Sequence, residues 1–223
     1  METATLLLKA PIVITELGKE FVRRGDECMV ADPTSQLSAC FLLAMRSVSL
    51  LCGMGSLLKP NIRDSLDVLV RAYAESRDLL MTFRFDDEGT RGKIQRWFLG
   101  KQEWNPEYKR VSAFLKHLSG NDAELAKRFG MQSSVSHPTA LAAKNSTAVA
   151  LAWAAKGKGT QACESNEHKL QPKIDDYLVC VGTLIVAATI DAPGWIPLGC
   201  DLARMPNVEP FRLEAAALLS GHG

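Results

Sequence analysis

The chain has 223 residues, of which 47% are hydrophobic and 23% charged, and its formal net charge is +1 at pH 7. That length suits one large domain or two small ones and is enough for a substantial core, and the near-zero charge excludes a global attraction to nucleic acid or to an anionic membrane. The six cysteines form no CxxC pair and lack the histidine spacing of a zinc finger, so we predict a reduced, cytoplasmic protein.

Helical periodicity dominates the sequence and predicts an all-α fold. A first helix is predicted over about residues 12–24, and Gly25 is expected to end it. A second helix is predicted over about residues 33–58, and because this stretch is almost wholly apolar, we expect it at the centre of a bundle. It is also long enough to cross a membrane. Since Arg46 interrupts it, we interpret it as a buried helix and expect no membrane partner.

A third, amphipathic helix is predicted over about residues 62–85. Two aspartates follow it and favour a new helix start, so a fourth helix is predicted over about residues 89–99. The apolar face of the third helix consists of Leu66, Leu69, Val70, Tyr73, Leu80 and Phe83. Its opposite, polar side carries Arg63, Asp64, Asp67, Arg77 and Asp78.

The second half of the chain continues the helical pattern around one polar interruption. Residues 156–172 are poor in apolar side chains and predict a mobile loop or linker. Residues 191–210 contain four prolines and are expected to be irregular. Further helices are predicted over about residues 108–118, 122–129, 139–155, 173–190 and 211–219. We therefore predict a single helical domain over residues 1–223, with long central hydrophobic helices and one long polar loop.

Several common site motifs are absent from the sequence. It contains no GxxxxGK[ST] phosphate loop, no GxGxxG, no HExxH and no GxSxG. The four histidines are scattered along the chain, so neither a histidine-based metal site nor a cofactor is expected.

Arg71 and Glu75 stand four positions apart, a spacing that places both side chains on one face of a helix. They lie at the boundary between the apolar and polar sides of the third predicted helix. One interpretation is an ordinary intrahelical ion pair, worth about 0.3–0.5 kcal/mol. The other is a partly buried pair that organises a polar cluster or lines a functional site.

Ser133 and His137 are also four positions apart, and His137 directly precedes a proline. The residue before proline disfavours helical backbone, so His137 is expected at a helix boundary. There the positive end of the next helix favours the neutral imidazole. A neutral imidazole can act as a general base, or it can accept a hydrogen bond that fixes the junction. Both interpretations stay open.

Arg110 and His117 are seven positions apart, which is two helical turns and one helix face. Lysines neighbour both residues. The pair therefore belongs either to a solvated basic face or to a catalytic site.

The segments LVRAYAES, DDEGTRGKIQRWF and FGMQSSVSHP together resemble a group of uncharacterised all-helical bacterial proteins. These proteins are similar to the HEPN superfamily, the higher eukaryote and prokaryote nucleotide-binding domains. In them a helical R-x-x-x-E element is followed by an S-x-x-x-H-P-like element. The resemblance covers about residues 62–141.

The resemblance implies an all-α bundle in which Arg71, Glu75, Ser133 and His137 approach one another as the catalytic residues. It also implies a function directed at RNA or a nucleotide, through a metal-independent ribonuclease-type mechanism assembled across a homodimer. In that mechanism the histidine acts as general base or acid on the ribose hydroxyl, and the arginine stabilises the phosphate charge.

The nuclease motif of the superfamily, R-x(4–6)-H, is not formed around His137. The arginine that precedes it, Arg128, lies nine positions away, which is too far. Arg110 and His117 do have the spacing and are candidate nucleic-acid-binding residues.

Superfamily members without the motif bind without catalysis. The alternative is therefore a non-catalytic helical binding or regulatory module, in which Arg71, Glu75 and His137 form a structural polar cluster. Whether the chain is an enzyme stays open.

Overall fold

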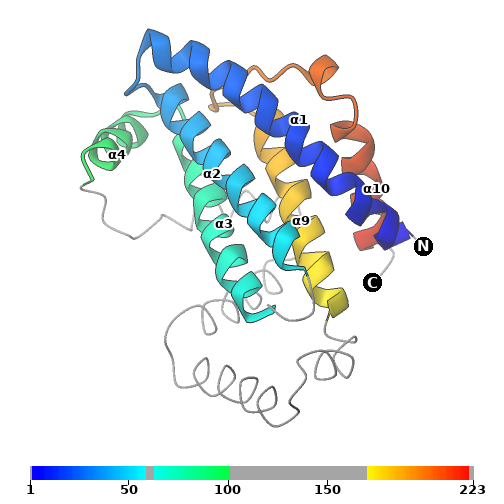
Figure 1. Cartoon of the computed structure of the whole chain (residues 1–223). Coiled ribbons are helices and arrows are strands. Elements are labelled where there is room, and N and C mark those ends of the chain that lie inside the picture. Colours follow the sequence, from blue (N-terminus) through cyan, green and yellow to red (C-terminus); the bar gives the residue numbers. More distant parts are fainter. Residues whose placement is uncertain (1, 59–62, 101–169, 221–223) are drawn as a thin grey trace, which may run out of the picture.

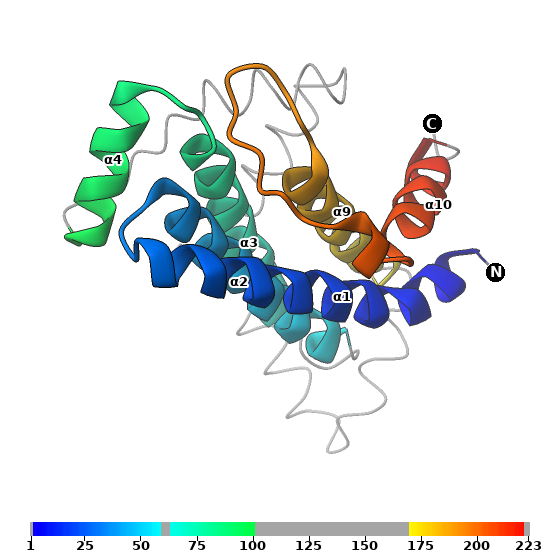
Figure 2. The same ribbon diagram turned by 90° about the horizontal axis from the view of Figure 1, so that it is seen from above.

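The computed structural model describes residues 2–58, 63–100 and 170–220 of the chain. Within these ranges it contains six α-helices, one short 3-10 helix and no β-strand, which confirms the predicted all-α fold. Four long helices, α1, α2, α3 and α9, lie side by side, while α10 packs beside α1 and α4 stands at one side of the bundle (Figure 1; Figure 2).

Helix α1 spans Glu2–Ala31 and includes Pro11. It is much longer than predicted, and the expected end at Gly25 is wrong. A side chain at Gly25 would meet Phe41 of the next helix at 3.2 Å. This glycine therefore permits close packing of two helices and does not end the first one. The inward face of α1 repeats every three or four positions, as helix geometry requires, and comprises Leu6, Ala10, Val13, Leu17 and Phe21.

Helix α2 spans Gln36–Leu57 and begins after Ser35, whose side chain accepts a hydrogen bond from the Ser38 backbone N–H. It packs against α1, α3 and α9, so the predicted central position of the apolar helix is confirmed. Among the described residues, α2 is also the one helix long and apolar enough to cross a membrane. About half of its most apolar stretch, 56%, is buried inside the structure.

Helices α3 (Arg63–Phe83) and α4 (Glu88–Phe98) lie close to their predicted bounds. Asp87 caps α4 by accepting the backbone N–H of Thr90, as the acidic pair predicted. The expected apolar face of α3 is buried, except that Leu69 is only partly buried. Sequence periodicity therefore located this part of the bundle well.

Helix α9 spans Leu170–Thr189 and α10 spans Val208–Ser220. The last residues of the predicted polar loop, from Leu170 onward, are thus helical. The rest of that loop and the predicted helices over residues 108–118, 122–129 and 139–155 lie outside the described residues. Residues 190–207, which we name the connecting segment, are irregular apart from the 3-10 helix η3 (Leu202–Arg204).

Candidate functional site

Arg71 and Glu75 form an ion pair on α3. Nε of Arg71 donates a hydrogen bond to Oε1 of Glu75 over 2.6 Å, and the side chains are only 15% and 32% exposed. The four-residue spacing predicted this pairing. Because both charges are recessed, removing either partner costs more than it would at an exposed surface pair. The geometry thus favours the interpretation as a partly buried pair.

Two further ion pairs lie along the same helix. Nε and Nη2 of Arg77 donate to Oδ1 of Asp78 at 2.9 and 2.6 Å, and Asp67 pairs with Lys173 near the start of α9. We name the three pairs the α3 ion-pair row: Arg71–Glu75, Arg77–Asp78 and Lys173–Asp67. The row contains three carboxylates and three cations, so its formal charge is zero.

The α3 ion-pair row corrects one prediction from the sequence. Asp67 and Asp78 were expected on a polar side opposite the apolar face, yet they are 9% and 5% exposed. The Arg77 side chain is also mostly buried. Buried carboxylates are tolerated where a cation and hydrogen bonds compensate for the lost water. Here Lys173 and Arg77 supply that compensation.

The remaining predicted site residues lie outside the described residues. These are Ser133, His137, Arg110 and His117. Their proximity to Arg71 and Glu75 stays a prediction, and so do the catalytic and nucleic-acid-binding roles assigned to them. Arg71 and Glu75 are the two predicted site residues that the structure describes.

Arg84 is a buried cation that the sequence analysis missed. It is 1% exposed, and its guanidinium donates to the carbonyl oxygens of Ala187 and Ile190 at 2.7 Å and of Ile196 at 3.1 Å. The ring of Trp195 lies 5.3 Å away, within cation–π range. Burial lowers the pKa of Arg84, because the charged form has lost its water.

Arg84 ties together the ends of two helices. The Ala187 carbonyl lies in the last turn of α9, and the Ile190 carbonyl directly follows the helix; helices leave acceptors without intrahelical donors at this end. The backbone adds to the link, since the Ile196 N–H donates to the Arg84 carbonyl at 2.8 Å. Only the two phenylalanines around Arg84 in the sequence hinted at burial, and they gave no sign of partners more than 100 positions away.

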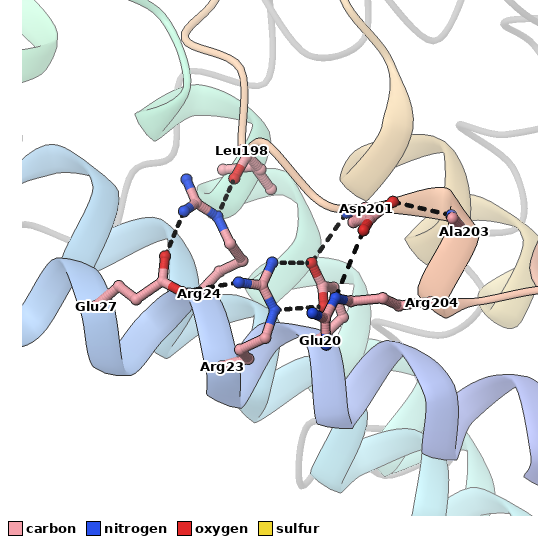
Figure 3. Close-up of polar contacts among 8 residues, drawn as sticks. All are labelled: Glu20, Arg23, Arg24, Glu27, Leu198, Asp201, Ala203 and Arg204. Atoms are coloured by element: carbon pink, nitrogen blue, oxygen red, sulfur yellow. Dashed lines mark hydrogen bonds and ion pairs between the residues drawn. The ribbon is translucent and has the colours of Figure 1, made fainter.

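A second polar network joins α1 to the connecting segment (Figure 3). Glu20 is buried, and both of its carboxylate oxygens accept hydrogen bonds from Arg23, at 2.6 and 2.9 Å. One of them also accepts the Asp201 backbone N–H at 2.9 Å. The bonds from Arg23 lower the pKa of Glu20, because they stabilise the carboxylate form.

Arg24 and Glu27 extend this network along α1. Glu27 accepts hydrogen bonds from Arg23 at 2.7 Å and from Arg24 at 2.5 Å, and Arg24 lies 3.5 Å from the Leu198 carbonyl (Figure 3). The spacing of three and four positions predicts pairs within α1, but the contacts to Leu198 and Asp201 join distant parts of the chain. The network anchors the connecting segment to α1.

No family model, curated protein or solved structure matches the chain. In the ranges that the structure describes, no group of three or more His, Cys, Asp or Glu side chains is placed to hold a metal ion. The class defined by the fold is an all-helical bundle, and its most distinctive polar feature is the recessed charge along α3.

Proposed function

We propose that this chain is an RNA- or nucleotide-directed helical protein of the HEPN-like type, with a site built around Arg71 and Glu75. The observation that carries the proposal is the recessed Arg71–Glu75 pair, 2.6 Å long, on α3 of an all-helical bundle. The sequence resemblance implies a charged pair on this helix. Recessed arginine is well suited to phosphate because its planar fork matches two phosphate oxygens.

The proposed mechanism is metal-independent cleavage of RNA. His137 removes the proton from a ribose 2′-hydroxyl, whose oxygen forms a bond to the neighbouring phosphorus while the bond to the 5′-oxygen breaks. The departing 5′-oxygen takes a proton from water and leaves as a hydroxyl. Arg71 stabilises the negative charge on the phosphate, and Glu75 holds the guanidinium in place. Ser133 is assigned to the same site as a polar contact. The proposal includes cytoplasmic location and assembly as a homodimer.

The test uses the full chain with end-labelled single-stranded RNA and a chelator. We expect cleavage that leaves a 2′,3′-cyclic phosphate, and no cleavage of a strand whose 2′-hydroxyls are methylated. His137→Ala, His117→Ala and Arg71→Gln are compared with Arg91→Gln, which changes an exposed ion pair on α4. Loss of cleavage in His137→Ala, with unchanged helical circular dichroism, supports the proposed base. If both histidine variants cleave RNA at the wild-type rate, neither histidine is the base that cleavage requires.

The second candidate function is a non-catalytic binding or regulatory module. The charge balance of the α3 ion-pair row favours it, because each cation already faces a carboxylate and the row has no surplus positive charge. In this case the row stabilises the bundle. In that case neither the wild-type protein nor any of the variants would cleave RNA in the chelator experiment.

Removing one member of the Arg71–Glu75 pair tests its structural role. Arg71→Ala and Glu75→Ala are each expected to lower the free energy of unfolding by about 1–3 kcal/mol, because each substitution removes the 2.6 Å bond between two recessed charges. Arg91→Ala serves as the control, since its pair with Asp86 is largely exposed and is worth less than about 1 kcal/mol. Urea denaturation measures the difference. Equal effects at both sites would show that the α3 pair behaves as a surface pair.

A further inference from the structure

Arg46 is the one charged residue in the otherwise apolar helix α2. Its Nε donates a hydrogen bond to Oγ of Ser76 on α3 at 3.0 Å. Ser76 is itself buried and donates to the Ala72 carbonyl at 2.8 Å. The buried hydroxyl therefore orients the guanidinium, while the Arg46 residue remains exposed to solvent.

The charge of Arg46 is not balanced in the described part of the chain. Ser76, a neutral group, is its hydrogen-bond partner there, and no carboxylate pairs with it. Most other arginines in the same ranges do have carboxylate partners, and Arg84 is enclosed by carbonyl oxygens. The paired arginines are Arg23, Arg24, Arg71, Arg77, Arg91, Arg204 and Arg212.

The position of Arg46 relates it to the candidate site. Its anchor, Ser76, directly follows Glu75 on α3. Consecutive helical residues are turned by about 100° around the axis and rise about 1.5 Å along it. Arg46 is thus at the same level of the bundle as the Arg71–Glu75 pair, on a neighbouring side of α3. A ligand that extends across α3 from the pair would meet a fixed, unbalanced positive charge.

We propose that Arg46 binds a phosphate of single-stranded RNA whose neighbouring nucleotides occupy the proposed site around Arg71 and Glu75. The inference rests on the proposed function and, of its two ligand classes, selects RNA over a mononucleotide. Because Nε is committed to Ser76, the two Nη groups remain to contact phosphate oxygens. Arg46 acts in binding, and it takes no part in breaking the phosphodiester bond.

The experiment measures binding of the full chain to a fluorescent RNA of about 12 nucleotides, a length typical of single-strand sites. The RNA carries 2′-O-methyl groups, so that it cannot be cleaved through its 2′-hydroxyls. Fluorescence anisotropy is recorded between about 50 and 200 mM salt. Arg46→Gln is compared with Lys19→Gln, which removes the same charge from an exposed position on α1. Arg46→Lys and Ser76→Ala complete the set.

We expect Arg46→Gln to weaken binding about 5-fold and to reduce the slope of log affinity against log salt by about 0.7, the value for one phosphate contact to a single strand. Arg46→Lys should keep the slope, because it keeps the charge. Ser76→Ala should weaken binding without changing the slope, since it frees the guanidinium from its anchor. Lys19→Gln should change neither quantity.

Two results overturn the inference, and they have different meanings. If the wild-type chain binds RNA and Arg46→Gln binds with the same affinity and salt slope, Arg46 is not a phosphate contact and the proposed function is unaffected. If the wild-type chain binds no RNA, the proposed RNA-directed function is wrong and the role of Arg46 is wrong with it. Thermal melting of each variant separates loss of binding from loss of fold. If Arg46→Gln does not fold, Ser76→Ala provides the test, because the inference predicts weaker binding for it and unchanged binding overturns the inference.

Discussion

A single guanidinium, that of Arg84, satisfies carbonyl groups from the end of α9 and from the connecting segment. Buried acceptors that lose their donors keep the full penalty of having left water. The stabilising effect of Arg84 therefore lies mainly in the acceptors that it satisfies. No carboxylate of the described residues forms an ion pair with it.

Arg84→Met is expected to lower the free energy of unfolding by about 3 kcal/mol, because several buried carbonyls lose their donor. Arg84→Lys keeps the charge but not the planar fork, so an intermediate loss is expected. Urea denaturation measures both, with the exposed Arg96→Met as control. A loss below about 1 kcal/mol for Arg84→Met would mean that water replaces the guanidinium at these carbonyls.

Glu20 makes stability depend on pH. Its pKa in the folded chain lies below its ordinary value of 4.5, so its contribution is fully present above pH 4.5 and is lost as the pH falls through the lowered value. Glu20→Gln should therefore reduce stability near neutral pH by about 1–3 kcal/mol. Its deficit relative to the wild type should shrink in acid below pH 4.5.

Glu209, near the other end of the chain, provides a matched control for Glu20→Gln. Glu209 also accepts two hydrogen bonds from an arginine three positions later, Arg212, but its side chain is 47% exposed, against 2% for Glu20. Glu209→Gln is expected to cost less than about 1 kcal/mol. If the two substitutions have the same effect, the burial of Glu20 and its contact with Asp201 contribute nothing.

At the level of the helices, the sequence predicted α3 and α4 well and α1 poorly. Periodicity and the cap at Asp87 are local signals. Helices α3 and α4 both begin and end within two residues of their predicted bounds. In α1, Gly25 suggested an end that packing overrides, and the helix begins well before the predicted start at about residue 12. Pro11 is inside the helix, and Gly25 faces Phe41. One residue type can end a helix or permit close packing, and tertiary contacts decide which.

Replacing each of two helical glycines by alanine should change the free energy of unfolding in opposite directions. Gly182 on α9 has open space around a new side chain, whereas a side chain at Gly55 on α2 would meet the Tyr177 hydroxyl at 3.0 Å. Gly182→Ala is expected to raise the free energy of unfolding by about 0.5–1 kcal/mol through helix propensity. Gly55→Ala should lower it, because the crowded and buried Tyr177 must move. Thermal melting of both variants measures the signs, and a stabilised Gly55→Ala would show that Tyr177 moves freely.

At the level of the whole molecule, contacts between distant segments form the core. Helix α10 packs against α1 and α9, and the Lys9–Glu214 pair joins the two ends of the described chain. The polar sites follow the same pattern. Arg71 and Glu75 could be predicted because they share a helix. The Lys173–Asp67 and Asp201–Glu20 contacts span 106 and 181 positions, and the pattern of one sequence does not specify such pairs.

Removal of α10 should therefore abolish cooperative unfolding. Val208, Phe211 and Ala215 are buried, and each large apolar side chain contributes about 1.5–3 kcal/mol by burial. Their partners on α1 and α9 would also become exposed. Since a domain is stable by only about 5–15 kcal/mol, a chain ending at Asn207 is expected to show no sharp melting transition by circular dichroism.

The control for this deletion keeps α10 and changes only its outer face. Leu213 is largely exposed, so Leu213→Ser should alter stability by less than about 0.5 kcal/mol. A sharp transition in the truncated chain would show that the remaining helices form a complete core.

The recessed charges along α3 have a consequence for work in concentrated electrolyte. Mobile ions weaken attractions between solvated charges beyond a Debye length of about 8–10 Å, but they enter buried pairs far less. The three pairs of the row should therefore persist at ionic strengths that dissociate most ligands held by charge. Purification in high salt should therefore leave the geometry of the α3 pairs intact.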